Sequence, residues 1–384
     1  KADATDMGEE EQQDIVYFVP GRLTNLSLIS YFSCHNPIMD LHVSDITQEG
    51  LPQISTLEGR AHRSQLTVSR QGLAVNDIVE TELPGKPSGL FTLKTHVNSD
   101  EHRYVVLPFV DGSIVLEITD NLVEVDNTGL LTDVKTIGLA SVVTDPAYIA
   151  TATADQTAYV QVYAEGMRIV FLSSDSQPGM PPRTFDWRAP ATMPIECCAF
   201  SQSQIIIGLR GGELKVFEFE MGSLVEVSSY TIGIEVSAVA LTPVVEGRLR
   251  GEYAIVAGLD STVRVFSLQV GQPLQQVVVQ VLPATCHQLS VSPLHAHYMH
   301  VFIGLTNGVL IRSLFDLSNG YITDPRKRVV GTRPVSLSQA ALGDSNTTAI
   351  IATSTRAWCH YTSAGKIMDA PLALPHIDYV ASFT

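Results

Sequence analysis

The stretch that decides the fold runs from Val301 to Leu337 and reads VFIGLTNGVLIRSLFDLSNGYITDPRKRVVGTRPVSL. Within it, an apolar run at 301–305 leads into the pair Asn307-Gly308, and a second β-rich run at 309–315 follows. Asn-Gly between two such runs is a strong hairpin signal, because both residues tolerate a positive φ. The stretch therefore predicts a β-hairpin, and the next question is whether this hairpin is repeated.

The same pattern recurs along the whole chain. Two β-rich runs around a turn are found at 52–70, 105–118, 158–172, 205–219, 254–268, 301–315 and 349–361. The spacing of roughly 50 residues falls within the period of propeller blades. An apolar strand precedes a copy, as at 236–241, and another follows, as at 274–282, which makes about four strands per repeat. The sequence therefore predicts an all-β fold, a seven-bladed β-propeller with four antiparallel strands per blade.

Closure of such a ring requires its two ends to meet. Residues 25–32 (NLSLISYF) resemble an outer strand that has no repeat of its own ahead of it, so we expect this N-terminal strand to complete the seventh blade. The inner strands of that blade are expected at 335–341, 348–353 and 357–362. A pair of β-sandwiches is the alternative architecture, but sandwiches predict no regular period.

Composition bounds the organisation of the chain. It has 384 residues, of which 45% are hydrophobic, enough for a full core. No window approaches the ~18 consecutive apolar residues of a membrane span. Residues 1–14 are acidic and Gln-rich, which predicts a disordered tail or linker ahead of a propeller over 15–384. The chain begins with Lys1 and no signal-peptide pattern follows, so we expect a piece of a longer protein.

The charge of the chain restricts the class of partner. A formal net charge of −16 disfavours broad nucleic-acid contact, since duplex-binding domains are usually basic. The local basic strip Arg326, Lys327 and Arg328 is the one candidate partner contact, either for an acidic partner or for a phosphate backbone. The competing interpretation is a solvated loop that keeps the turn soluble.

No constellation for catalysis emerges from the sequence. His295 and His297, close to His300, have the alternating spacing of a metal-binding strand face, but neither Cys nor carboxylate lies nearby. The expectation is therefore a solvated loop that enters a strand at 299–304. Cys197 and Cys198 lie on a predicted inner strand, where successive residues face opposite sides and pack in the core. Because no nucleophile, base and orienting group occur together, we expect no enzyme activity, no cofactor and no metal.

The two tryptophans, Trp187 and Trp358, exclude the commonest propeller type. A signalling propeller of the WD kind carries repeated Gly-His and Trp-Asp pairs, and this chain has neither as a repeat. The sequence therefore predicts a divergent propeller whose rigid surfaces serve as a scaffold.

The hairpin and its exit resemble a known family. Ile303-Gly304-Leu305-x-Asn307-Gly308-Val309-Leu310-x-Arg312 and Gly331-x-Arg333-Pro334-Val335 are similar to the middle propeller of the splicing factor 3B subunit 3 family. The large damaged-DNA-binding protein and the large subunit of the cleavage and polyadenylation specificity factor share that fold. The resemblance covers nearly all of 15–384, and Ser354-x-Arg356-x-Trp358 is similar to the splicing member. Residues 173–183 look inserted.

The resemblance implies one propeller of a three-propeller protein with a helical domain. That protein is a non-catalytic scaffold in the nucleus, a subunit of the splicing factor 3b complex of the U2 small nuclear ribonucleoprotein (snRNP), acting in branch-site recognition and spliceosome assembly. The implied partners are the HEAT-repeat subunit and small subunit 5, mainly through the other two propellers, and other spliceosomal proteins. Little direct nucleic-acid binding and no membrane contact are implied. The chain is expected to continue beyond Thr384. The alternative is a damaged-DNA-binding-type adaptor of a cullin ubiquitin ligase.

Overall fold

Antiparallel β-strands build almost all of the described chain. The computed structural model describes residues 36–45, 52–70, 72–76, 78–119, 122–173, 182–220, 222–245, 247–269, 271, 273–295, 298–342, 347–363, 365–374 and 377–383. In these ranges the strands form six four-stranded sheets and one three-stranded sheet. The described helices are three short 3-10 turns, η1 (Ala61–Arg63), η2 (Pro146–Tyr148) and η3 (Ala154–Gln156). No helix in this part of the chain has the length and apolar character needed to cross a membrane.

The chain divides into two compact units, which are described separately. The smaller unit, 1–44 with 53–69, contains the three-stranded antiparallel sheet of β1 (Ile38–Ser44), β2 (Gln53–Glu58) and β3 (Gln65–Arg70). Many apolar side chains of this sheet are exposed, including Leu66 at 70%. The larger unit, 45–52 with 70–384, contains the six four-stranded sheets.

In the larger unit, each sheet is a run of four consecutive strands whose order along the chain is also their order across the sheet. The sheets are β4 (Phe91–Lys94), β5 (His102–Pro108), β6 (Ser113–Ile118), β7 (Leu122–Glu124); β8 (Thr136–Val143), β9 (Thr157–Tyr163), β10 (Gly166–Phe171), β11 (Arg183–Arg188); β12 (Ile195–Phe200), β13 (Gln204–Leu209), β14 (Glu213–Glu220), β15 (Ser223–Thr231); β16 (Val236–Leu241), β17 (Tyr253–Gly258), β18 (Thr262–Ser267), β19 (Gln275–Val281); β20 (Cys286–His295), β21 (Tyr298–Leu305), β22 (Val309–Phe315), β23 (Ile322–Val329); and β24 (Ser336–Leu342), β25 (Thr347–Thr353), β26 (Ala357–Ser363), β27 (Lys366–Pro371).

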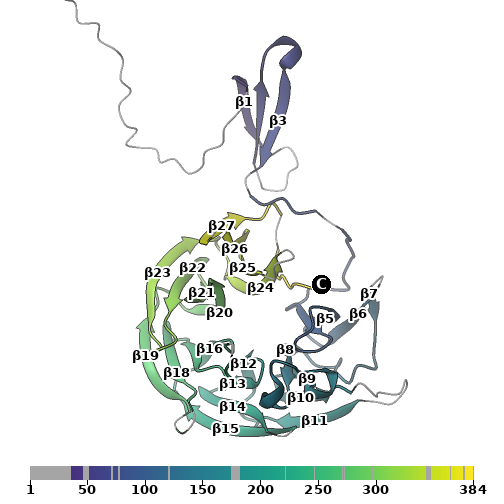
Figure 1. The fold of residues 1–384 in the computed structure, drawn as a ribbon, viewed down its shortest axis with the longest axis vertical. Coiled ribbons are helices and arrows are strands. Elements are labelled where there is room, and N and C mark those ends of the chain that lie inside the picture. Colours follow the sequence, from purple (N-terminus) through teal and green to yellow (C-terminus); the bar gives the residue numbers. More distant parts are fainter. Residues whose placement is uncertain are drawn as a thin grey trace, which may run out of the picture. The chain divides into compact units, whose positions relative to one another are not determined.

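The first strand of every four-stranded sheet faces one shared cavity. Residues from β4, β8, β12, β16, β20 and β24 line a space of about 960 Å³, together with residues 379–382. Each of these strands contacts the next along the series, and the last strand of each sheet lies on the outside (Figure 1). This arrangement is consistent with the blades of a β-propeller.

The inner sheets of the series are buried on both faces, because a neighbouring sheet packs against each side. Every residue of β13 is buried. Ile205 and Ile207 pack toward the β8–β11 sheet, whereas Ile206 packs toward the β16–β19 sheet. Successive side chains of a strand point to opposite faces, so a strand covered on both faces is apolar at almost every position. The apolar run of β21 has the same cause.

The hairpin predicted from Asn307-Gly308 is confirmed. β21 and β22 pair antiparallel on either side of this turn. Gly308 has a φ of +81°, and the side-chain oxygen of Asn307 accepts a hydrogen bond from the backbone N–H of Val309 at 3.2 Å. The carbonyl of Gly331 lies against Gly308, where a Cβ would otherwise be placed. The strands predicted at 335–341, 348–353 and 357–362 are also present, as β24, β25 and β26.

The last described residues connect the last four-stranded sheet to the first. Thr353 of β25 donates its hydroxyl to the carbonyl of Asp378 at 3.1 Å, and Thr92 of β4 donates its hydroxyl to the carbonyl of Ser382 at 3.0 Å. Val380 packs between these contacts on the β24–β27 sheet. The strand predicted at 25–32 lies outside the described residues, and the fourth strand of the last sheet is β27.

Candidate functional site

The basic strip lies on a strand, and the prediction of a loop for it is wrong. Arg326, Lys327 and Arg328 belong to β23, the outermost strand of its sheet. Asp324 has a φ of +48°, and the pairing of β22 with β23 shifts register at this point, which is a β-bulge. Proline is tolerated at bulges and on edge strands, so the strand continues through Pro325 where the sequence indicates a turn.

Strand alternation separates the three basic residues. Arg328 pairs with Leu310, and Lys327 pairs with Ile311. Leu310 packs in the interface with the β24–β27 sheet, whereas Ile311 packs in the interface with the β16–β19 sheet. Because paired residues share a face, Arg328 and Arg326 lie on the side of the β24–β27 sheet and Lys327 lies on the other.

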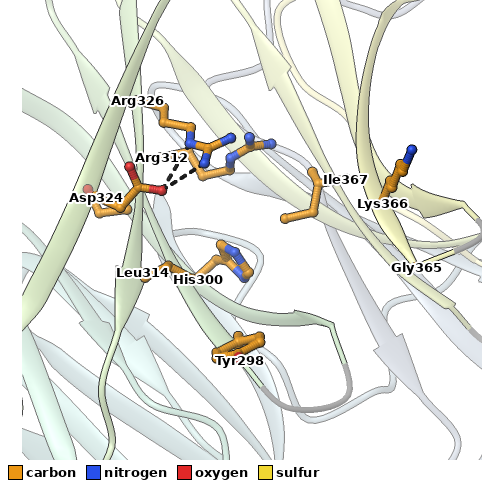
Figure 2. A pocket seen from close by; sticks show the side chains of 10 residues that line it. Tyr298, His300, Arg312, Leu314, Asp324, Arg326, Gly365, Lys366 and Ile367 are labelled. Carbon is orange, nitrogen blue, oxygen red and sulfur yellow. Dashed lines mark hydrogen bonds and ion pairs between the residues drawn. The ribbon is translucent and has the colours of Figure 1, made fainter.

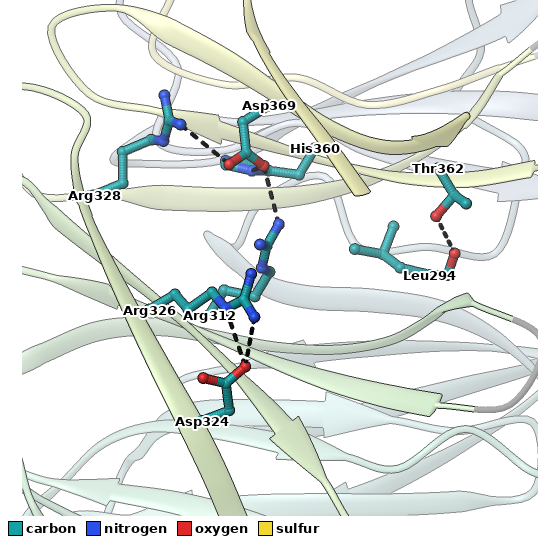
Figure 3. Close-up of polar contacts among 8 residues, drawn as sticks. All are labelled: Leu294, Arg312, Asp324, Arg326, Arg328, His360, Thr362 and Asp369. Carbon is teal, nitrogen blue, oxygen red and sulfur yellow. Dashed lines mark hydrogen bonds and ion pairs between the residues drawn. The ribbon is translucent and has the colours of Figure 1, made fainter. Parts of the chain in front are cut away.

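Asp369 of β27 joins the two sheets through three polar contacts. Its carboxylate lies 3.0 Å from the Arg312 Nη1, 3.2 Å from the Arg328 Nη2 and 2.7 Å from the His360 Nδ1 (Figure 3). Burial by itself raises the pKa of the Asp369 carboxyl. The hydrogen bond with His360 and the nearby positive charges outweigh that effect, so the pKa is lowered. Asp369 is therefore ionised at neutral pH.

Arg328 and Arg326 differ in the strength of their contacts within the protein and in their exposure to solvent. The guanidinium of Arg328 lies 4.6 Å from the centre of the Trp358 ring, a cation–π contact that adds to its ion pair with Asp369. The side chain of Arg326 is 67% exposed, and its ion pair with Asp324 spans 2.9 Å. Exposed pairs of this kind contribute only about 0–1 kcal/mol, so Arg326 can exchange Asp324 for an external anion.

Two hollows between the β20–β23 and β24–β27 sheets meet at Arg312 and Arg326. The larger measures about 390 Å³ (Figure 2) and the smaller about 240 Å³, and we call them together the basic groove. The charged side chains on its side of β23 and β27 are the four cations Arg312, Arg326, Arg328 and Lys366 and the two carboxylates Asp324 and Asp369, and Lys327 borders the smaller hollow from the opposite face of its strand. The groove is thus locally positive in a chain whose formal net charge is −16.

The predicted histidine cluster is not a single loop. His300 is a buried residue of β21, in the strand expected at 299–304, and it lines the basic groove. His295 is the last residue of β20, and His297 lies outside the described residues. Within the described ranges, no group of three or more His, Cys, Asp or Glu side chains is placed to hold a metal ion.

The adjacent cysteines occupy the predicted inner strand. Cys197 and Cys198 lie on β12, the first strand of its sheet. Cys198 packs in the interface with the β8–β11 sheet and Cys197 in the interface with the β16–β19 sheet. Burial raises the pKa of both thiols, that of Cys197 to about 12. The two side chains therefore lie on opposite faces and serve as core residues.

Sequence reasoning did not single out Arg312, His360 and Asp369 as a group. Arg312 and Asp369 are 57 residues apart and meet only because two sheets pack together. The one local sign of this group in the sequence is Arg312, a charged residue in the otherwise largely apolar run VLIRSLF of β22.

Six four-stranded sheets whose first strands share one cavity define this protein as a member of the β-propeller class. Comparison with protein-family models matches residues 75–384 to the second β-propeller of the RSE1/DDB1/CPSF1 proteins. The chain belongs to that family.

The similar proteins are splicing factors. Splicing factor 3B subunit 3 of Danio rerio is 31% identical over 390 residues, which covers 97% of this chain and 30% of that protein. Spliceosome-associated protein 130 A of Arabidopsis thaliana is 31% identical over 98% of this chain and 30% of its own length. Pre-mRNA-splicing factor RSE1 of Pyricularia oryzae is 32% identical over 92% of this chain and 28% of its own. The resemblance to the splicing family is confirmed, and the chain spans about 30% of the length of these relatives.

Proposed function

We propose that this propeller is the middle module of a three-propeller, non-catalytic scaffold that acts in pre-mRNA splicing. The observation that carries the proposal is the 31% identity to a splicing factor 3B subunit 3 across 97% of the chain. The match to a second-propeller family model supports the middle position. A propeller offers large rigid surfaces that need no chemistry of their own, which suits a scaffold.

In this proposal the full-length protein is a nuclear subunit of the splicing factor 3b complex within the U2 snRNP. The HEAT-repeat subunit and small subunit 5 bind mainly to the other two propellers. The middle propeller is then the part with surface left for further spliceosomal proteins. We also infer a ring of seven blades to which residues 25–32 contribute a strand.

Affinity purification of the tagged full-length protein tests the proposal. We expect proteins of the U2 snRNP, including the HEAT-repeat subunit, to co-purify and to be identified by mass spectrometry. Recovery of a cullin without U2 proteins would contradict it and would favour the adaptor of a ubiquitin ligase. An unrelated tagged nuclear protein at the same expression level is the control.

A further inference from the structure

We propose that the basic groove binds an acidic peptide segment of a partner protein. An apolar side chain of the segment occupies the larger hollow, and its carboxylates contact Arg326 and Lys366. The inference rests on the proposed function, because it names the kind of partner that the scaffold holds at this site. The groove lies between two sheets that are joined by the partly buried contacts of Asp369.

The first argument is charge. One carboxylate, Asp369, is shared by Arg312 and Arg328, and Asp324 contacts Arg326. Lys366 adds a further exposed cation to the lining. The groove therefore keeps an excess of positive charge after its internal ion pairs are formed. On a chain with a net charge of −16, this local reversal attracts anionic groups that the rest of the surface repels.

The second argument is the apolar part of the lining. Tyr298, Leu314 and Ile367 line the larger hollow beside its cations (Figure 2), and the side chain of Tyr298 is 58% exposed. Met368, the residue after Ile367, is 45% exposed. A volume of about 390 Å³ lies in the range of small-ligand pockets and accommodates a large apolar side chain. An apolar anchor flanked by complementary charges is the usual arrangement of an interface hot spot.

The third argument favours a peptide over RNA. Single-stranded RNA brings one phosphate per nucleotide and relies on exposed aromatic rings for base stacking. Trp358 presents its ring to Arg328, which leaves Tyr298 as the exposed aromatic ring of the lining, whereas stacking of successive bases uses several rings. Phosphates beyond the groove would also meet the negative surface of a chain with a net charge of −16. A short acidic segment confines its charges to the groove.

The test is site-specific photo-crosslinking in the full-length protein within its native assembly. Tyr298 is replaced by a photoreactive phenylalanine derivative, and crosslinked products are identified by mass spectrometry. We expect a protein segment rich in Asp and Glu. Its yield should fall about tenfold in the double variant Arg326→Glu, Lys366→Glu, because each charge reversal weakens binding by about threefold. The yield should also fall as salt is raised, since exposed charges are screened.

The matched control is Arg210→Glu, in the turn between β13 and β14 of a different sheet. Arg210 is 60% exposed and pairs with Glu196 at 2.8 Å, so it resembles Arg326 in exposure and pairing. We expect this variant to crosslink like the wild type. Crosslinks to RNA, crosslinks to segments without an acidic excess, equal losses in both variants, or no crosslink at all would each overturn the proposal.

Co-purification of U2 proteins is scored in the same samples. If they are present while crosslinking fails, only the groove inference falls; if they are absent, the proposed function itself falls.

Discussion

Asp369 and Asp324 both form ion pairs with arginines of the basic groove, but in different surroundings. Arg312, the partner of Asp369, has a side chain only 13% exposed, whereas the partner of Asp324, Arg326, is 67% exposed. Removing one member of a buried pair leaves a charge without compensation, which is costly. We therefore expect Asp369→Asn to lower the free energy of unfolding by about 2 kcal/mol, measured by denaturant unfolding.

Asp324→Asn is the matched control for that substitution. Asparagine also tolerates the positive φ of this position, so only the exposed ion pair is lost. We expect a change close to the limit of measurement. Equal destabilisation by the two substitutions would show that the burial of Asp369 has no energetic effect.

The lowered pKa of Asp369 also predicts how the stability of the protein depends on pH. Its folded-state pKa is lowered by His360 and by Arg312 and Arg328, against the effect of burial. Between the folded-state pKa and the unfolded value of about 3.9, the unfolded chain binds more protons, so stability rises with pH in that window. The stabilisation is therefore complete above the unfolded value and is lost as the pH falls through the folded one. We expect the stability difference between wild type and Asp369→Asn to be largest at neutral pH and to shrink below about pH 4. Unfolding curves at several pH values measure it, and a constant difference would refute the assignment.

At the scale of the element, the β21–β22 hairpin depends on one glycine. Gly308 has a positive φ, and a Cβ there would collide with the backbone carbonyl of Gly331. Gly308→Ala therefore combines backbone strain with a clash against the backbone of the segment between β23 and β24. We expect a loss of about 2–3 kcal/mol in the free energy of unfolding, measured by denaturant titration.

Gly211, in the turn between β13 and β14, separates the two effects. Its φ of +91° is also positive, but a Cβ at this position meets no atom within 4 Å. Gly211→Ala should show the backbone strain alone, about 1 kcal/mol. If both substitutions had the same effect, the contact with Gly331 would not contribute.

The elements that could be predicted from the sequence are those set by local rules. The strand expected at 236–241 is β16, because apolar β-formers between turn residues are sufficient to define a strand buried on both faces. The basic strip was interpreted as a solvated loop from its charge, and it directly follows Asp324-Pro325, a pair typical of turns. The structure tolerates that pair in an outermost strand, where a bulge and a missing N–H interrupt the ladder at its edge. The basic strip forms a strand because it lies at the outer edge of its sheet. The local sequence does not indicate that position.

The site was less predictable than the strands. The basic strip was found from its charge alone, but its partners Arg312, His360 and Asp369 come from three other strands of two sheets. Their convergence depends on how one sheet packs on the next. No spacing rule within a single strand encodes that packing.

At the scale of the whole molecule, the closure proposal makes a distinct prediction. We expect deletion of residues 15–33 from the full-length protein to lower the melting temperature by more than about 5 °C, because the ring loses the strand proposed at 25–32. Deletion of residues 1–14, the acidic N-terminal stretch, should leave it unchanged. Thermal unfolding followed by circular dichroism measures both. An unchanged melting temperature after the first deletion would contradict closure by residues 25–32.

The sharing of each interface between consecutive sheets has a consequence for synthesis on the ribosome. A newly emerged sheet, such as β12–β15, has covered one apolar face with its predecessor but must wait for β16–β19 to cover the other. With successive sheets roughly 50 residues apart, the wait lasts about 3–10 s at ordinary rates of translation. During that time the nascent chain presents a fresh apolar surface to the cytosol. Chaperone occupancy on such a chain should therefore rise and fall once per blade.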